Sequence, residues 1–380
     1  MQSHFPWPRP WMLAPWRCLA LVGGVLAVHQ VRGWPGPCAP LGTAAACAVF
    51  LAAISLEIVL YYFGVIWLAD LEHIAIQAAN ALVTVLHVVL LLAAVRGRRE
   101  LADALECLRL YGARRVLRAQ GVAATLALAS LVLLHATIFT CYTVAFASVS
   151  VPFLGPARTA IVFGLLLLQQ MQWSVAFVLM LYPMVVVGSL SADLRRDCSQ
   201  TAALRVRRST SSPDEQRLAP HVWRELRLRQ HILHNIGYTN IRTHQEHVVL
   251  VVAGALVSPS MYLSHSLWEL SRSGTTMTAL MSAVVGLHYF MDLTVFSFSC
   301  QWFFYESAAI KQVLHGFLVE TGSLNSQETR EVRAFIQQID RQQNFSIWGL
   351  FEIDKKFTAT IILAATSHIA VLVQAQATFF

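Results

Sequence analysis

Residues 121–148 read GVAATLALASLVLLHATIFTCYTVAFAS and contain no Lys, Arg, Asp or Glu. A helix needs about 20 mostly apolar residues to cross the hydrocarbon core of a bilayer, and this stretch is longer than that. A helix pairs its backbone groups within one segment, whereas a lone strand in lipid leaves them without partners. The stretch therefore predicts a transmembrane helix.

Further stretches of the same character run along the chain. Counting residues 121–148, seven predicted spans cover 41–68, 73–95, 121–148, 160–190, 248–268, 277–305 and 357–376. No series of short alternating segments suggests a β-barrel. An apolar run at 18–31 is shorter and is predicted to be interfacial or re-entrant, with cleavage as a signal segment as the alternative. The predicted fold class is all-α, a polytopic membrane protein with seven transmembrane helices.

The composition of the whole chain agrees with a lipid environment. The chain has 380 residues, of which 56% are hydrophobic and 13% are charged, and its mean hydropathy is +0.55. Soluble domains carry about 25% charged residues. A cytosolic enzyme, a secreted disulfide module and a disordered protein are therefore poor fits.

The positions of Lys and Arg predict the orientation. Of the 28 basic residues, 26 lie in segments on one side of the predicted spans, and only Arg158 and Arg272 lie on the other. Cytoplasmic loops are enriched in Lys and Arg, so the N-terminus is predicted to be cytoplasmic and the C-terminus extracellular. A G-protein-coupled receptor has the opposite orientation, and the Asp-Arg-Tyr triplet of that class is absent after the third span. The net charge of +7 thus reflects membrane orientation and does not indicate nucleic-acid binding.

The connections between spans predict an organisation in four parts. These are a cytoplasmic N-terminal segment at 1–40, spans one to six with their loops at 41–306, cytoplasmic anchor helices at 307–356, and the seventh span with a short outer tail at 357–380. The polar segment 207–220 is predicted to be a linker, and 221–247 has a helical pattern. The cytoplasmic helices are expected to pack as a layer beneath the membrane.

Two segments near the C-terminus carry the most specific motif. Residues 349–354 read GLFEID, and the last apolar helix ends in SHIAVLVQA at 367–375. Together they resemble the C-terminal signature of insect gustatory receptors, in which Thr-Tyr, apolar residues and Gln-Phe close the seventh span. Insect odorant receptors share the architecture, but the 349–354 segment is more similar to the gustatory branch. Three positions depart from the family pattern, namely Ser367 for Thr, His368 for Tyr and Ala375 for Phe.

The resemblance implies a ligand-gated cation channel in the plasma membrane. It implies a homo- or heterotetramer of related receptors, in which the seventh span of each subunit lines a central pore. Gln374 is the candidate pore residue, because a ring of amides can hydrate a passing cation. Val371 and Ala370 could form a dewetting constriction, and Ala375 would make the gate wider than the family's aromatic residue does. The alternative for Gln374 is exposure to interfacial water at a helix end.

Polar stripes on several spans are the candidate ligand-binding surface. They have helical spacing, and with the predicted orientation they lie towards the outer half of the bundle. The candidates are His73, Gln77, Asn80, Gln169, Gln172, Trp173, Ser258, Tyr262, His265, Thr278, Ser282 and Tyr289. The alternative is hydrogen bonding between helices inside the bundle.

Other chemistry has little support in the sequence. Glu57 and Asp292 are the acidic groups deepest in the spans, so each is expected to find a partner such as an amide or hydroxyl, to face a cavity, or to become protonated. The histidine pairs at 231–247 are interpreted as a solvated helix and not as a metal site. The seven cysteines form no CxxC pair. No catalytic residues, metal or cofactor are predicted.

The predicted function is a gustatory receptor that acts as a tastant-gated, nonselective cation channel. Its partners would be a small tastant, either a sugar or a bitter compound, together with membrane lipid and permeant cations. The alternatives are a transporter of a small polar solute, an odorant-type receptor channel and a scaffolding membrane protein.

Overall fold

The fold was analysed in a computed structural model. It describes residues 129–131, 133–141, 144, 156–207, 213–272, 276–321 and 326–379. The first two predicted spans lie outside these residues, and the third is described only in part, including the apolar helix Ala129–Cys141. The remaining elements are α5 (Pro156–Arg207), α6 (Pro213–Thr243), α7 (Gln245–Arg272), α8 (Thr276–Thr321), α9 (Ser326–Asp340), β1 (Ser346–Ile347), β2 (Phe351–Glu352) and α10 (Lys355–Phe379).

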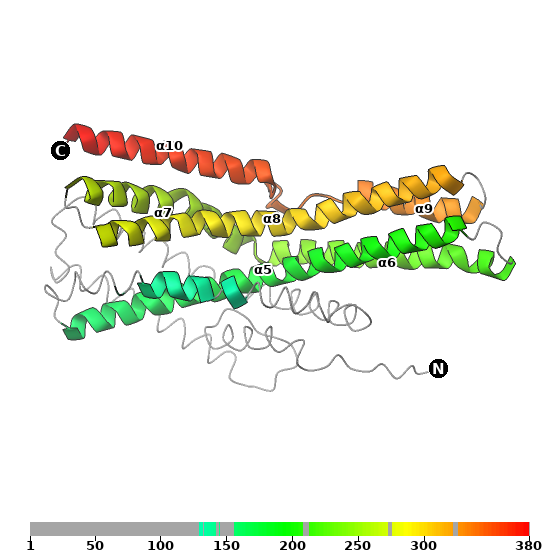
Figure 1. The fold of residues 1–380 in the computed structure, drawn as a ribbon, viewed down its shortest axis with the longest axis horizontal. Helices are drawn as coiled ribbons and strands as arrows, with labels where there is room; N and C mark the ends of the chain where they lie inside the picture. Colours follow the sequence, from blue (N-terminus) through cyan, green and yellow to red (C-terminus); the bar gives the residue numbers. More distant parts are fainter. Residues whose placement is uncertain are drawn as a thin grey trace.

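Helices α5 and α8 are far longer than a membrane span. They contain 52 and 46 residues. At a rise of about 1.5 Å per residue, each is more than twice as long as the roughly 30 Å hydrocarbon core. Both helices run along the long axis of the molecule (Figure 1). Each therefore joins an apolar half of the structure to a second, more polar half.

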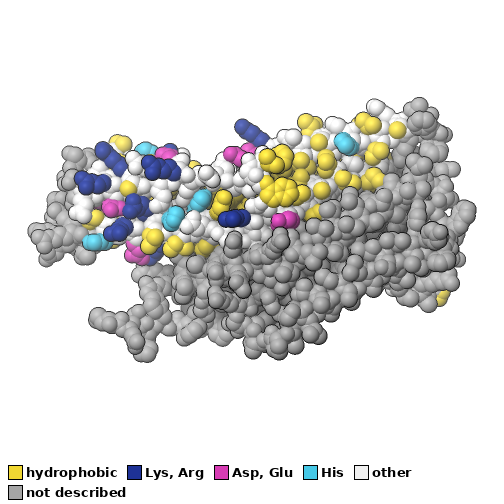
Figure 2. Space-filling model, turned by 180° about the vertical axis from the view of Figure 1, so that it is seen from behind, with side chains coloured by type: hydrophobic (Ala, Val, Ile, Leu, Met, Phe, Trp, Pro, Cys, Tyr) yellow, Lys and Arg dark blue, Asp and Glu magenta, His cyan; other side chains and the backbone are white. Residues whose placement is uncertain are grey.

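The two halves differ in the helices that they contain. In one half α7 and α10 lie beside the first part of α8, and in the other half α6 and α9 pack on the last parts of α5 and α8 (Figure 1). On the face shown in Figure 2, basic side chains gather over one half, and hydrophobic side chains are prominent over the described part of the other. The apolar half is the part suited to lipid.

Three of the predicted spans coincide with helices long and apolar enough to cross a membrane. Within the described residues these stretches are Gln245–Ser264, Ala279–Thr321 and Lys355–Ala375. They correspond to the fifth, sixth and seventh predicted spans. The fourth predicted span, 160–190, lies within α5. The helical character predicted from the apolar runs is confirmed at these four places.

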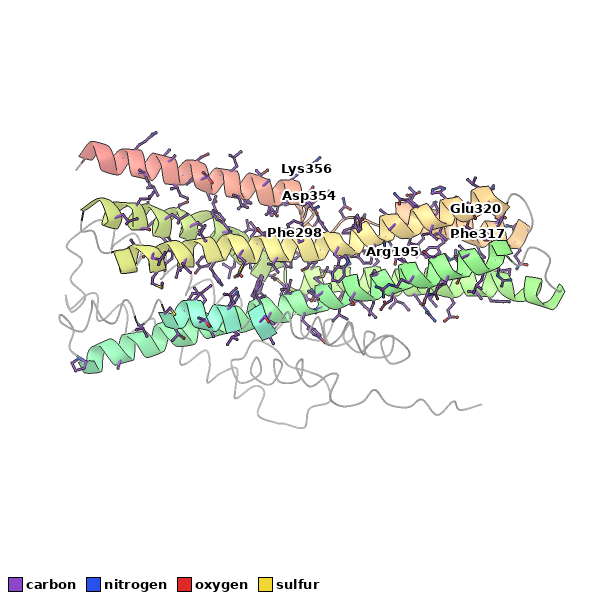
Figure 3. All side chains as sticks on the ribbon, viewed as in Figure 1. Arg195, Phe298, Phe317, Glu320, Asp354 and Lys356 are labelled. Carbon is purple, nitrogen blue, oxygen red and sulfur yellow. The ribbon has the colours of Figure 1, made fainter. Side chains whose placement is uncertain are left out.

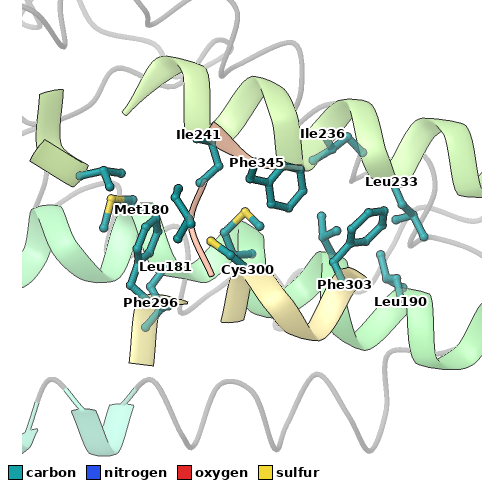
Figure 4. Packing of buried hydrophobic residues seen from close by; sticks show 14 of the residues in the cluster. Met180, Leu181, Leu190, Leu233, Ile236, Ile241, Phe296, Cys300, Phe303 and Phe345 are labelled. Atoms are coloured by element: carbon teal, nitrogen blue, oxygen red, sulfur yellow. The ribbon is translucent and has the colours of Figure 1, made fainter. Parts of the chain in front are cut away.

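A continuous hydrophobic core joins the two halves. Phe296, Cys300 and Phe303 project from α8 between α5 and α6, where they meet Met180 and Leu233 among other buried side chains (Figure 4). Towards the end of α8, the fully buried Trp223 of α6 contacts Phe317. Their rings are tilted relative to each other, with centroids 5.1 Å apart. The Trp223 Nε1–H donates a 2.8 Å hydrogen bond to Glu328 of α9. These contacts hold α6, α8 and α9 together as one layer.

The linker predicted at 207–220 is shorter in the structure. Helix α6 begins at Pro213 and includes Pro220. Proline is tolerated at the first position of a helix, since its missing N–H has no intrahelical partner there. The apolar face that continues through Trp223, Leu226 and Leu233 is buried, and that burial supports α6 in spite of Pro220. The helix predicted at 221–247 is interrupted only at His244, the turn between α6 and α7.

The GLFEID segment provides part of the turn and the second strand of a small hairpin just before α10. Strands β1 and β2 are antiparallel, with Ser346 opposite Glu352. Trp348 and Gly349 have φ values of 51° and 71°, and the Leu350 N–H donates to the Ile347 carbonyl over 2.9 Å. Positive φ at both central positions is typical of a type I′ turn, which explains the glycine.

Candidate functional site

Among the apolar helices that the structure describes, α10 is the least buried. Only 11% of its most apolar 18-residue stretch is buried inside the chain, compared with 61% of the corresponding stretch of α7. One side is packed, because Ala365 is buried and the Ser260 hydroxyl of α7 donates to its carbonyl over 3.3 Å. The Thr358 hydroxyl also donates to Ser297 of α8 over 2.6 Å. The rest of this apolar helix is left for lipid or for another chain.

The predicted gate residues lie on the open part of α10. Ala370, Val371, Gln374 and Ala375 are all exposed, and Val371 has 63% of its surface accessible. They follow one another towards the C-terminal end of the helix, which lies at one extreme of the long axis (Figure 1). A pore role for these residues requires neighbouring copies and stays a prediction.

Four predicted ligand-binding residues lie on α7 and α8. Ser258, Tyr262, Ser282 and Tyr289 are all buried. Tyr262 lies against Gly286, where a Cβ would be 3.2 Å from the Tyr262 Cβ. Glycine allows the two helices to approach closely here, as small residues do in membrane bundles. The structure thus places Tyr262 at a tight contact between α7 and α8 and buries the other three on the same two helices.

The other predicted ligand-binding residues cannot be placed in the same way. His73, Gln77 and Asn80 lie outside the described residues. Gln169, Gln172 and Trp173 lie within α5, His265 within α7 and Thr278 within α8, but their side chains are outside the described part. Ligand contact by any of the predicted residues stays a prediction.

A buried polar cluster lies where helix Ala129–Cys141 meets α8. His135, His288 and Asp292 have no exposed side-chain surface. The His135 Nε2 is 2.9 Å from the Asp292 Oδ1, and the His288 Nε2 is 3.6 Å from the Asp292 Oδ2. The two imidazole rings have centroids 4.2 Å apart. Asp292 is therefore paired, as expected for a buried carboxylate, and two of its partners are histidines.

Aromatic rings surround this cluster. Phe139 lies 5.0 Å from the His288 ring, and Phe177 of α5 lies 5.9 Å from the His135 ring, measured between centroids. A carboxylate in apolar surroundings needs close polar partners, which the histidines supply. Neither histidine was predicted from the sequence as a partner of Asp292. The spacing of His288 and Asp292, four residues apart on a helix, is the signal that was available.

A groove of about 840 Å³ lies between α8 and the foot of α10. The aromatic residues Phe298, Trp302 and Tyr305 line it on the α8 side, and Asp354 and Lys355 line it on the other side (Figure 3). The Lys355 Nζ is 5.2 Å from the centre of the Phe298 ring, within the range of a cation–π interaction. The sequence analysis did not predict this groove, since its walls lie far apart in the chain.

The comparison with protein families decides the class of the chain. A model described as 7tm chemosensory receptor matches residues 15–379. The chain belongs to this chemosensory receptor family. The resemblance to insect gustatory receptors is thereby confirmed, and the chemosensory receptor is an all-α, multi-pass membrane protein and not an enzyme. No curated protein sequence matches it.

Solved structures show the fold of this chemosensory receptor. The insect olfactory receptor OR5 from Machilis hrabei is similar with a TM-score of 0.60 and 11% identity, over 96% of this chain and 98% of that one. The same receptor in complex with eugenol is similar with a TM-score of 0.57 and 11% identity, over 96% and 99% of the two chains. At this identity the likeness shows a shared seven-transmembrane fold.

Proposed function

We propose that this chemosensory receptor is a gustatory receptor that acts as a tastant-gated, nonselective cation channel in the plasma membrane. The observation that carries the proposal is the low burial of α10. This helix is apolar, yet only 11% of its most apolar 18-residue stretch is buried inside the chain. A membrane helix with so few contacts in its own chain is suited to packing around a shared axis with copies of itself. Four subunits, identical or related, would each contribute one α10 to a central pore.

The orientation of the channel follows from the charge distribution. With 26 of 28 basic residues on one side, the N-terminus and the α6–α9 layer are cytoplasmic, and the C-terminal end of α10 is outside. Gln374 and Ala375 then lie near the outer end of the pore, with Ala370 and Val371 deeper. A ring of Gln374 amides hydrates cations, and a ring of Val371 side chains closes the pore by dewetting.

The ligand binds in the outer half of the bundle. Tyr262 and Ser282 lie in the parts of α7 and α8 nearer the connection between these helices, and Ser258 and Tyr289 lie closer to the middle of the spans. The related OR5 receptor has been solved in complex with eugenol, a small odorant. In the present receptor the ligand opens the pore only if it binds the open state more tightly than the closed state. The contact of α10 with α7 at Ser260 and Ala365 is the direct route from this region to the pore helix.

Whole-cell recording of the chain expressed alone, and with a related receptor, tests the channel. A panel of sugars and bitter compounds with a calcium readout first identifies an agonist. The agonist is then expected to evoke a cation current whose relative permeability to cations changes in Gln374→Ala. The matched control is Gln376→Ala, which removes the same amide about 200° further round the helix. Saturable uptake without any current would instead identify a transporter.

The ligand site has a separate test. Tyr262→Phe and Ser282→Ala remove one hydroxyl each at the α7–α8 contact and keep most of the packing volume. If they contact the tastant, the agonist concentration for half-maximal current rises by about tenfold for each lost hydrogen bond, while permeability is unchanged. Ser299→Ala is the control, since the Ser299 hydroxyl donates within α8 to the Val295 carbonyl over 2.8 Å. Equal agonist sensitivity in all variants would place the ligand elsewhere.

A further inference from the structure

The polar cluster of His135, His288 and Asp292 has the composition of a transition-metal site. One ligand atom from each residue can be chosen so that all three atoms lie within 4.8 Å of one another. Two imidazoles and one carboxylate suit zinc and similar divalent ions, whereas calcium and magnesium prefer oxygen ligands. The ligands come from two helices that are distant in sequence, so a bound ion would join helix Ala129–Cys141 to α8.

The distances fit a tetrahedral ion. Zinc bonds of about 2.0–2.2 Å at tetrahedral angles separate neighbouring ligand atoms by about 3.3–3.6 Å. The separation between the His135 Nε2 and the Asp292 Oδ1 is 2.9 Å, and that between the His288 Nε2 and the Asp292 Oδ2 is 3.6 Å. The first value lies below this range and the second at its upper end, and the two involve different oxygens of Asp292. Small side-chain rotations would open one pair and close the other around an ion.

Histidine nitrogens without hydrogen-bond partners also indicate a metal ion at this cluster. Both ring nitrogens of His288 and the Nδ1 of His135 are buried, and within the described part of the chain none has a hydrogen-bond partner. A buried polar atom left in this state costs about 1–3 kcal/mol. A metal ion at the His288 Nε2 would supply the missing partner. Helix packing alone gives no reason to place a second histidine beside the pair that His135 already forms with Asp292.

We propose that His135, His288 and Asp292 bind a first-row divalent transition-metal ion of the zinc type. Three protein ligands leave a fourth position open, which water or a donor atom of a small molecule can take. The two neutral imidazoles and one carboxylate leave the bound ion with net positive charge, among the rings of Phe139 and Phe177. The ion clamps helix Ala129–Cys141 to α8. This proposal does not rest on the channel function.

Metal analysis of the full-length receptor tests the site. The receptor is purified in detergent, treated with a chelator, equilibrated with micromolar free Zn²⁺ and analysed for bound zinc. We expect about one zinc per chain, and we expect Co²⁺ in its place to give the visible absorption of a tetrahedral site. The apparent affinity should fall at least tenfold in His288→Phe, which keeps a ring of similar size, and in Asp292→Asn.

A control separates loss of the site from loss of the fold. His244→Phe replaces a buried histidine at the α6–α7 turn, away from the cluster, and should bind zinc like the wild type. Zinc should raise the thermal midpoint of the wild type and of His244→Phe but leave that of His288→Phe unchanged. The proposal is overturned if the wild type binds no stoichiometric zinc, or if His288→Phe binds as tightly as the wild type.

Discussion

The ring of Phe345 fills the space left by the missing side chain of Gly237. A Cβ on Gly237 would lie 2.6 Å from the Phe345 Cζ. The same ring stacks on Phe303 of α8 with centroids 5.6 Å apart, and contacts the tilted ring of Phe304 with centroids 4.6 Å apart. The Phe345 carbonyl also accepts a 2.9 Å hydrogen bond from the Ile353 N–H. Gly237 therefore determines how the hairpin packs on α6 and α8. Because α10 follows the hairpin directly, Gly237 also affects the position of the N-terminal end of α10.

Substitution of two helical glycines should have opposite effects. Gly237→Ala forces the buried Phe345 ring to move, which is expected to lower the stability by about 1–3 kcal/mol. Gly316→Ala in α8 meets no atom within 4 Å, so it should raise the stability by about 0.5–1 kcal/mol through helix propensity. Thermal midpoints of the detergent-solubilised receptor measure both. In Gly237→Ala/Phe345→Leu part of the loss should be recovered, and full additivity would show that the ring is not the cause.

Adjacent arginines on α5 should differ in their contribution to stability. The Arg195 Nε is 3.0 Å from the Oε2 of Glu306, whose side chain is 6% exposed and also accepts a 3.2 Å hydrogen bond from Trp302. Arg195→Ala leaves a buried carboxylate without its cation and should cost about 1–3 kcal/mol. The pair of Arg196 with Asp193 is more exposed, so Arg196→Ala should cost about 0.5 kcal/mol or less. Similar thermal midpoints for the two variants would contradict this difference.

Asp354 should stabilise the first turn of α10. Its Oδ1 accepts a 2.7 Å hydrogen bond from the Phe357 N–H, the geometry of an N-cap. Asp354→Ala is expected to cost about 1 kcal/mol, whereas Asp354→Asn keeps the acceptor and should cost little. Hydrogen exchange measured on peptides from the start of α10 should become faster in the alanine variant alone. Equal exchange in both variants would mean that the cap does not limit the opening of this turn.

His244 should make the receptor less stable in acid. Burial lowers its pKa to about 4, while its Nδ1–H donates to the Asn240 carbonyl over 2.9 Å. The unfolded chain, with an ordinary pKa near 6.5, takes up a proton first as the pH falls. Stability should therefore be constant above about pH 6.5 and fall by about 1.4 kcal/mol for each unit between pH 6.5 and 4. Burial also lowers the pKa of His234, which adds a change of the same sign.

His244→Phe should remove the contribution of His244 to this pH dependence. Thermal midpoints of the wild type and of the variant, measured at half-unit steps from pH 4 to pH 8, give the difference in slope. The two curves should run parallel above about pH 6.5 and separate below it. Curves that stay parallel down to pH 4 would show that His244 is not buried as a neutral group.

The transmembrane helices were predictable because the length of an apolar run is a local property. The runs at 248–268, 277–305 and 357–376 coincide with α7, the first part of α8 and α10. The family was also visible in a short contiguous motif, GLFEID at 349–354. The structure adds the physical reason for this motif, since its residues form the turn, the second strand and the N-cap that begin α10.

The sequence alone determined that the chain is a seven-helix membrane protein of the chemosensory receptor type, since apolar length and contiguous motifs are read along the chain. Only the tertiary structure decided which side chains meet. His135 and Asp292 are 157 residues apart, and no pattern around either one predicts their 2.9 Å contact. The groove beside Phe298 and the contact of Phe345 with Gly237 likewise depend on the packing of long helices against each other. Packing brings distant residues together through geometry that a local pattern does not contain.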